Sequence, residues 1–207
     1  DRYGFRNEDS LWDTQKIDVL FIGDSFTVGD CVWDGDSFVD VFASLNPNLS
    51  VLNLGIGGDG PVLALAKLRE YARAIRPDVV IWAYYEGNDL TKDLAKELHN
   101  PVLKRYLINS DYSQMLLNRQ SEIDAALKVH IESLSRPSIS QNSSHVQSKS
   151  INWKRLLMLD MLRTALGLTN GYNVEDVETF GDILKRARQI TETWGGKIIF
   201  VYLPSKT

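Results

Sequence analysis

The sequence predicts an α/β fold of three layers, in which helices cover both faces of a parallel central sheet. Four apolar, largely β-branched runs alternate with segments of helical periodicity, and such runs are typical of strands buried on both faces. Strand–helix–strand alternation favours parallel strands joined by right-handed crossovers. A third observation agrees: each of the first three runs ends in a polar cluster, where open parallel sheets bind their ligands.

The four predicted strands are short and evenly apolar. They are IDVLFI at residues 17–22, LSVLNL at 49–54, DVVIWAYY at 78–85 and KIIFVYL at 197–203. Three strands therefore fall within the first 90 residues, and a long stretch of chain separates the third from the fourth.

Three helical patterns connect these strands. Residues 36–46 and 61–76 carry apolar side chains at helical spacing, and Pro61 suits a first helical turn. Residues 174–196 form the third pattern, which ends at Gly195 and a second glycine, as helix C-termini often do.

The stretch between residues 91 and 150 is unusually long for a connection in such a sheet. It has helical patterns followed by a segment of low hydrophobicity, and long insertions are usually lids, partner surfaces or disordered loops. We therefore expect an α/β domain made of residues 1–90 and 151–207. Residues 91–150 would be a helical and flexible insertion after the third strand, a candidate lid, and residues 151–168 a helix that returns to the domain.

Composition excludes several classes of function. The formal net charge of -4 gives no basic surface for nucleic acid or anionic lipid. No apolar run approaches the roughly 20 residues that cross a bilayer. The single cysteine, Cys31, excludes an internal disulfide and a cysteine-based zinc site. We predict no metal, no other cofactor, no nucleic-acid partner and no membrane span.

Three polar clusters follow the first three strands. They are Gly23-Asp24-Ser25, the sequence GIGGDG at Gly55–Gly60, and EGND at residues 86–89. Carboxyl ends of parallel strands meet at one edge of the sheet. The clusters therefore predict a site at that edge, which the fold alone does not require.

Ser25 and Asn88 are the candidate reactive side chains. A serine just past a strand, before a helix, can act as a nucleophile with backbone N–H groups beside it. Asn88 can donate a side-chain N–H to a developing oxyanion. Taken alone, Ser25 is better explained as a helix cap and Asn88 as a turn residue. Their occurrence together at one edge favours the functional interpretation.

The glycine cluster GIGGDG also allows a nucleotide-binding interpretation. It satisfies the dinucleotide-binding pattern G-x-G-x-x-G between a strand and a helix, and Glu86 could serve as the ribose-binding carboxylate. However, a complete strand and helix precede it, and a dinucleotide site leaves Ser25 and Asn88 without a role. The same glycines would let a backbone N–H approach a reacting carbonyl closely.

The segments FIGDSFTVG, NLGIGGDG and GND, in this order, resemble the first three sequence blocks of the SGNH hydrolases, also called GDSL-type esterases and lipases. The resemblance covers roughly the first 90 residues and the fourth strand. It implies a flavodoxin-like fold, with Ser25 as nucleophile and its own backbone N–H as one oxyanion donor. The backbone N–H of Gly58 and the side chain of Asn88 would be the other donors, and Asp24 would fix the turn.

The family's fourth block, Asp-x-x-His, is absent. The only histidines are His99, His130 and His145, all between residues 91 and 150. We therefore expect this chain to be the nucleophile-bearing part of a longer protein that supplies the general base. Recruitment of His130 or His145 is the weaker alternative.

The resemblance implies a serine esterase or acyl hydrolase that acts on a small-molecule or glycan ester, or on an O-acetyl group, through an acyl-serine intermediate. Alternatives are a glycan O-acyltransferase or deacetylase of the same fold, a nucleotide-binding Rossmann-type protein, and a catalytically inactive binding domain. Bacterial relatives of this type are often exported or membrane-tethered, which favours such a location here.

Overall fold

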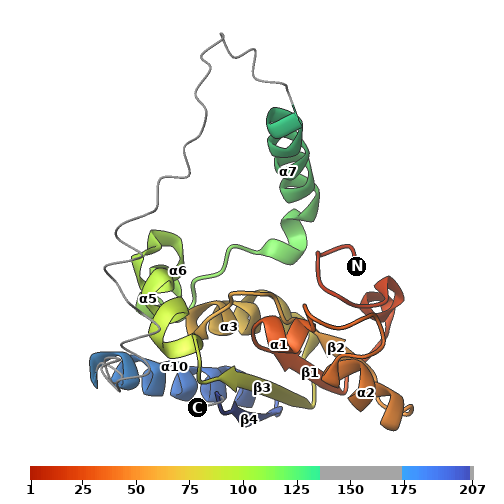
Figure 1. Cartoon of the computed structure of the whole chain (residues 1–207), viewed down its shortest axis with the longest axis horizontal. Coiled ribbons are helices and arrows are strands. Elements are labelled where there is room, and N and C mark those ends of the chain that lie inside the picture. Colours follow the sequence, from red (N-terminus) through yellow and green to blue (C-terminus); the bar gives the residue numbers. More distant parts are fainter. Residues whose placement is uncertain (136–173, 206–207) are drawn as a thin grey trace, which may run out of the picture. The chain divides into compact units, whose positions relative to one another are not determined.

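The computed structural model describes residues 1–135 and 174–205. It divides the chain into two compact units, one of Asp1–Gln120 with Val174–Thr207 and one of Ser121–Asn173. The first unit has the predicted α/β fold (Figure 1). The low-hydrophobicity segment beyond residue 135 and the helix expected at 151–168 lie outside the described residues.

The sheet has four parallel strands in the order β2-β1-β3-β4. The strands are β1 (Val19–Ile22), β2 (Val51–Asn53), β3 (Val79–Tyr85) and β4 (Lys197–Leu203). Val19 lies opposite Val51 on one side and Val79 on the other. All four predicted strands are thus confirmed, and the order is consistent with a flavodoxin-like sandwich.

Alternating side chains divide the core between the two faces of the sheet. Leu20 and Ile22 are fully buried in the larger hydrophobic cluster, together with residues of α3 (Pro61–Lys67) and α10 (Val174–Glu192). Val19 and Phe21 belong to a smaller cluster against α2 (Phe38–Leu45). Helices therefore cover both faces, which confirms the predicted layers.

Local sequence signals set where the helices begin and end. Ser37 and Asp40 form a reciprocal capping box at the start of α2, and Pro61 is the first residue of α3. The helix predicted at residues 61–76 is present, but its middle is π-helical at Leu68–Ala72 before it ends as α4 (Arg73–Ile75).

Two short helices that follow β3 belong to the α/β unit. They are α5 (Leu94–His99) and α6 (Pro101–Ile108). Leu94 and Tyr106 are fully buried in the larger core cluster, so the boundary between the units lies at Ser121 and not at the start of the expected insertion. In the second unit, α7 (Gln120–Ser135) exposes an apolar stripe of Leu127, Ile131 and Leu134.

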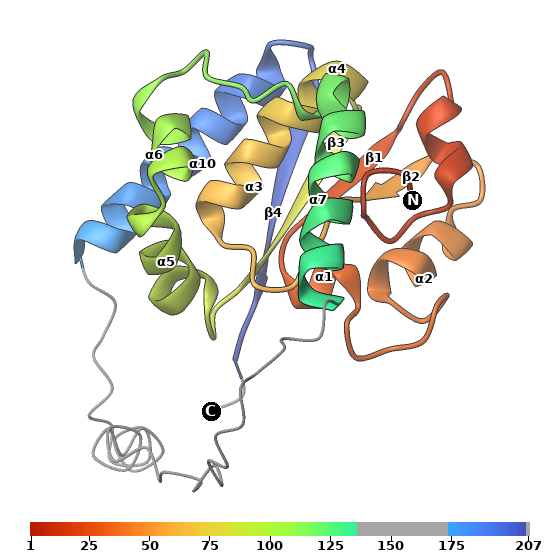
Figure 2. The same cartoon turned by 90° about the horizontal axis from the view of Figure 1, so that it is seen from above.

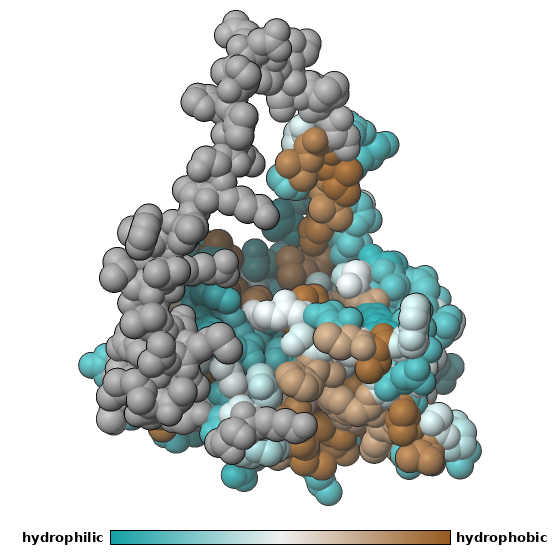
Figure 3. Space-filling model, viewed as in Figure 1, coloured by the Kyte–Doolittle hydropathy of each residue, from teal (hydrophilic) through white to brown (hydrophobic). Residues whose placement is uncertain are grey.

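The strand β4 carries exposed apolar side chains. Ile199 is 49% exposed and Val201 36% exposed. Figure 3 shows apolar surface gathered on this part of the molecule.

Among the described helices, none combines the length and the apolar character needed to cross a bilayer.

Candidate active site

Ser25 is the first residue of α1 (Ser25–Val28), directly after β1. The fully buried Asp24 caps this helix, because its carboxylate accepts the Phe26 N–H at 2.9 Å. This confirms the structural role predicted for Asp24. A side chain at Gly23 would lie 2.6 Å from the Ala83 carbonyl, so the close approach of the turn to β3 requires glycine.

The glycine-rich loop lies beside this turn. Ile56 N–H donates to the Gly23 carbonyl at 3.3 Å, and a Cβ on Gly57 would lie 3.8 Å from the Ser25 Cβ. Gly58 has a φ of 81° and nothing within 4 Å of a built Cβ, so its backbone is open. The first two predicted clusters therefore meet at the carboxyl edge of the sheet.

Asn88 reaches the same edge but faces inward. Its amide Nδ2 donates to the Asp93 carboxylate. Burial raises the pKa of Asp24, and the nearby Asn88 amide opposes part of that rise, although Asp24 Oδ2 has no hydrogen bond of good geometry. Asn88 has two side-chain N–H groups. Asp93 accepts one of them, and Asp24 competes with any ligand for the other.

An apolar pocket of about 280 Å³ opens at Ser25. Phe26, Val32 and Phe38 supply apolar walls, and Asp30 and Cys31 also line it. Within the described part of the chain, the Ser25 hydroxyl has no hydrogen bond that would hold it in place. Gly58 and Asn88 are not among the residues that line this pocket. Ser25, Gly58 and Asn88 therefore lie at the same edge of the sheet and are connected by contacts of adjacent residues. They do not line one common cavity.

A cluster of buried ionisable side chains lies beneath the site. This carboxylate cluster comprises Asp24, Asp59, Asp89, Asp93 and Glu97, with Lys67 among them, and each is at most 6% exposed. Burial chiefly raises the pKa of Asp59 to about 6, of Glu97 to about 7 and of Asp89 to about 8. Lys67 forms an ion pair with Asp59, and burial lowers the pKa of this lysine.

The Glu97 carboxylate caps the start of α3 from a distant part of the chain. It accepts N–H groups from Gly60 and Val62 at 2.8 Å, and from Leu63 at 3.2 Å. In a dinucleotide site, the pyrophosphate takes the place at the N-terminus of the helix that follows the glycines. Because Glu97 already occupies that place, the geometry weighs against the nucleotide-binding alternative.

The described histidines supply no base to the Ser25 pocket. His99 lies in α5, where its Nδ1 contacts the Ala95 carbonyl of the same helix. His130 lies in α7 of the second unit, and His145 is outside the described residues. Among the residues that the structure describes, no group of three or more His, Cys, Asp or Glu side chains is arranged to hold a metal ion.

Comparison with known proteins does not identify a relative. The chain matches no protein-family model. No curated protein matches it either.

Sequence reasoning missed the pocket walls and the carboxylate cluster. Asp59 and Asp89 are within the GIGGDG and EGND segments, but their burial depends on Glu97 and Lys67, which lie at other points of the chain. Asp30 had a weaker sequence signal, namely its position just after the short helix that begins at Ser25.

Proposed function

We propose that this chain provides the nucleophile and oxyanion donors of a serine esterase that works through an acyl-serine intermediate. The observation that carries the proposal is the position of Ser25. Its hydroxyl, without a hydrogen bond partner in the described chain, lines an apolar pocket at the carboxyl edge of a parallel sheet. The three sequence blocks that resemble SGNH hydrolases support it independently.

The reaction has two steps. Ser25 Oγ attacks the ester carbonyl and loses its proton to a base, and the collapse of the tetrahedral intermediate releases the alcohol, which takes up a proton. Water then attacks the acyl-serine and releases the acid. The Ser25 and Gly58 backbone N–H groups would stabilise the oxyanion in both steps, together with the Asn88 N–H for which Asp24 competes.

Among the described residues, no histidine lines the pocket at Ser25. The Asp30 carboxylate lies beside the Gly57–Gly58 loop, since a Cβ on Gly57 would lie 2.5 Å from Asp30 Oδ2. A carboxylate this close to the oxyanion position would oppose the developing negative charge. The substrate entering the pocket is expected to bring an apolar acyl group toward Phe26 and Val32.

Hydrolysis of p-nitrophenyl acetate tests the assignment. Ser25→Ala is expected to abolish hydrolysis. It should also abolish the increase in mass that acetylation of Ser25 gives to the peptide containing this residue. Asn88→Ala is expected to lower kcat by about a hundred- to a thousandfold, the usual cost of one oxyanion donor. Ser44→Ala is the matched control, because Ser44 is an exposed serine of α2. Hydrolysis that survives Ser25→Ala unchanged refutes the proposal.

A further inference from the structure

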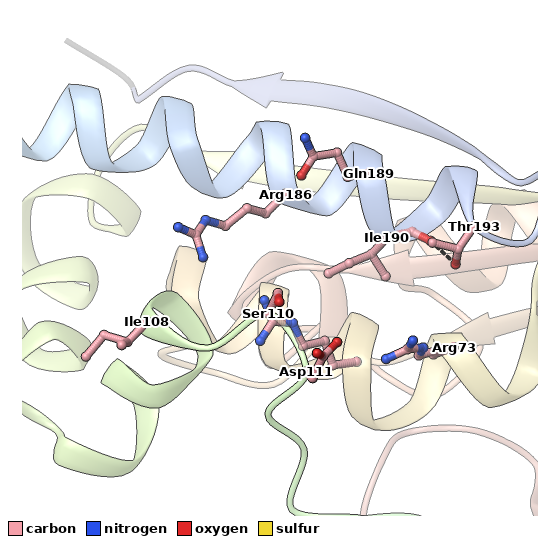
Figure 4. Close-up of a pocket in the computed structure, with 9 residues that line it drawn as sticks. Arg73, Ile108, Ser110, Asp111, Arg186, Gln189, Ile190 and Thr193 are labelled. Carbon is pink, nitrogen blue, oxygen red and sulfur yellow. Dashed lines mark hydrogen bonds between the residues drawn. The ribbon is translucent and has the colours of Figure 1, made fainter.

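A second cavity, of about 460 Å³, is lined by three arginines (Figure 4). Arg69 and Arg73 come from the helical segment that precedes β3, and Arg186 comes from α10. Figure 4 shows Ser110 and Asp111 on the loop between these helices.

This cavity is separate from the Ser25 pocket. Both α4 and α10 end shortly before the strand that follows them begins, so their last residues lie at the edge where strands start. Ser25 follows the end of β1 and lies at the opposite edge. Figure 2 shows α4 and α1 at the two opposite ends of the sheet.

Arginines outnumber carboxylates in this cavity. Within the described part of the chain, none of the three arginines forms a salt bridge, and Asp111 is the one carboxylate that lines the cavity. Arg69 is only 6% exposed. Its burial, and then the nearby charge of Arg186, lower its pKa, while the charge of Asp111 acts in the opposite direction. An excess of buried positive charge is costly, and a bound anion would relieve that cost.

Helix capping explains only part of this arrangement. Arg69 donates to the Asn109 carbonyl at 2.6 Å, and Arg186 donates to the Leu107 carbonyl, so both stabilise the end of α6. Each uses one of five N–H groups in that role. Arg69 Nε is buried with no hydrogen bond, and Arg73 takes no part in the capping.

We propose that this cavity binds a phosphate monoester. A dianionic phosphoryl group would accept hydrogen bonds from the Arg73 and Arg186 guanidinium groups, which suit phosphate geometry. The Ser110 hydroxyl is a further donor. The volume fits a ligand of metabolite size, and Ile108 and Ile190 provide apolar contact for the organic part. The inference is independent of the esterase proposal.

Calorimetric titration of the 207-residue chain tests the inference, with inorganic phosphate and phenyl phosphate as probes and chloride at matched ionic strength as reference. Saturable binding at one site is expected, with phenyl phosphate the tighter probe. Arg73→Gln and Arg186→Gln should each weaken binding about tenfold, as expected for the loss of a charge-assisted hydrogen bond. Arg73 is exposed, so that variant tests the site even where Arg186→Gln lowers stability.

Arg188→Gln is the matched control. Arg188 lies on the same helix, is 74% exposed at its side chain and pairs with Glu192, so this exchange removes the same charge from the same element. Binding by this variant should equal that of the parent. Absence of saturable phosphate binding, unchanged binding by Arg73→Gln and Arg186→Gln, or an equal loss in Arg188→Gln would each overturn the proposal.

Discussion

Asp89 gives the most direct test of the buried carboxylate cluster. It is 2% exposed, and its Oδ2 accepts the Tyr85 N–H at 3.0 Å while Oδ1 has no partner. Burial, and to a lesser extent the charges of Asp24, Asp93 and Glu97, raise its pKa to about 8. The Asp89→Asn exchange keeps an oxygen acceptor for Tyr85 and mimics the protonated carboxyl.

The sign of the effect follows from proton linkage. Between about pH 4 and pH 8 the folded protein keeps a proton on Asp89 that the unfolded chain releases, so stability falls as pH rises through this window. For one proton the slope is about 1.4 kcal/mol per pH unit, or about 4 kcal/mol between pH 5 and pH 8. Because the neighbouring carboxylates titrate together with Asp89, this loss of unfolding free energy is shared among them. We expect Asp89→Asn to recover at least about 1 kcal/mol of it.

Urea unfolding followed by tryptophan fluorescence, at intervals from about pH 5 to pH 9, measures the effect. Asp89→Asn should be close to the parent in stability at pH 5 and more stable at pH 8. Asp182→Asn is the control, because Asp182 is 67% exposed at its side chain and should give a profile parallel to the parent. If the Asp89→Asn profile also runs parallel to the parent, the pKa of Asp89 is not raised and the interpretation of the cluster is wrong.

Three further exchanges test other contacts by the same unfolding assay. Glu97→Ala leaves three N–H groups at the start of α3 without an acceptor and should cost about 2–4 kcal/mol; an unchanged midpoint would contradict this capping role. Lys67→Met leaves Asp59 buried without its cation and should lower the free energy of unfolding by about 3 kcal/mol at pH 8. The loss should be smaller at pH 5, where Asp59 is protonated, and a loss that does not change with pH would contradict the pairing. Gly55→Ala places a Cβ 2.5 Å from the Val28 backbone nitrogen and should destabilise by about 1–3 kcal/mol while lowering Ser25-dependent ester hydrolysis; full activity would show that the loop does not support α1.

The sheet could be predicted because its signals are local. Each strand is a continuous apolar run, and strands β1, β2 and β3 end at the polar clusters that the sequence marks. Their parallel pairing follows from alternation with helices. The assignment of α6 to the core was not predictable in this way, because it depends on the burial of Tyr106 among residues distant in the sequence. The π-helical stretch at Leu68–Ala72 also lacks a local sequence signal.

The site was only partly predictable for a related reason. Ser25 and the glycine loop occupy neighbouring strand ends, so topology alone brings them together. The inward orientation of Asn88 depends on Asp93, which the periodicity of the sequence does not mark as buried. The arginine cavity likewise combines α4 with α10, and 98 residues of chain lie between these two helices. Contacts of such sequence separation leave no local pattern.

The carboxylate cluster also bears on the proposed chemistry. An oxyanion that forms beside Asn88 would be repelled by ionised carboxylates beneath it, and the low dielectric of the interior would strengthen that repulsion. Burial raises the pKa of Glu97 to about 7 and of Asp89 to about 8, and Lys67 pairs with Asp59, so these three carboxyl groups carry less negative charge near neutral pH than exposed ones would. In the proposed reaction, their burial would therefore weaken the repulsion between the cluster and a developing oxyanion.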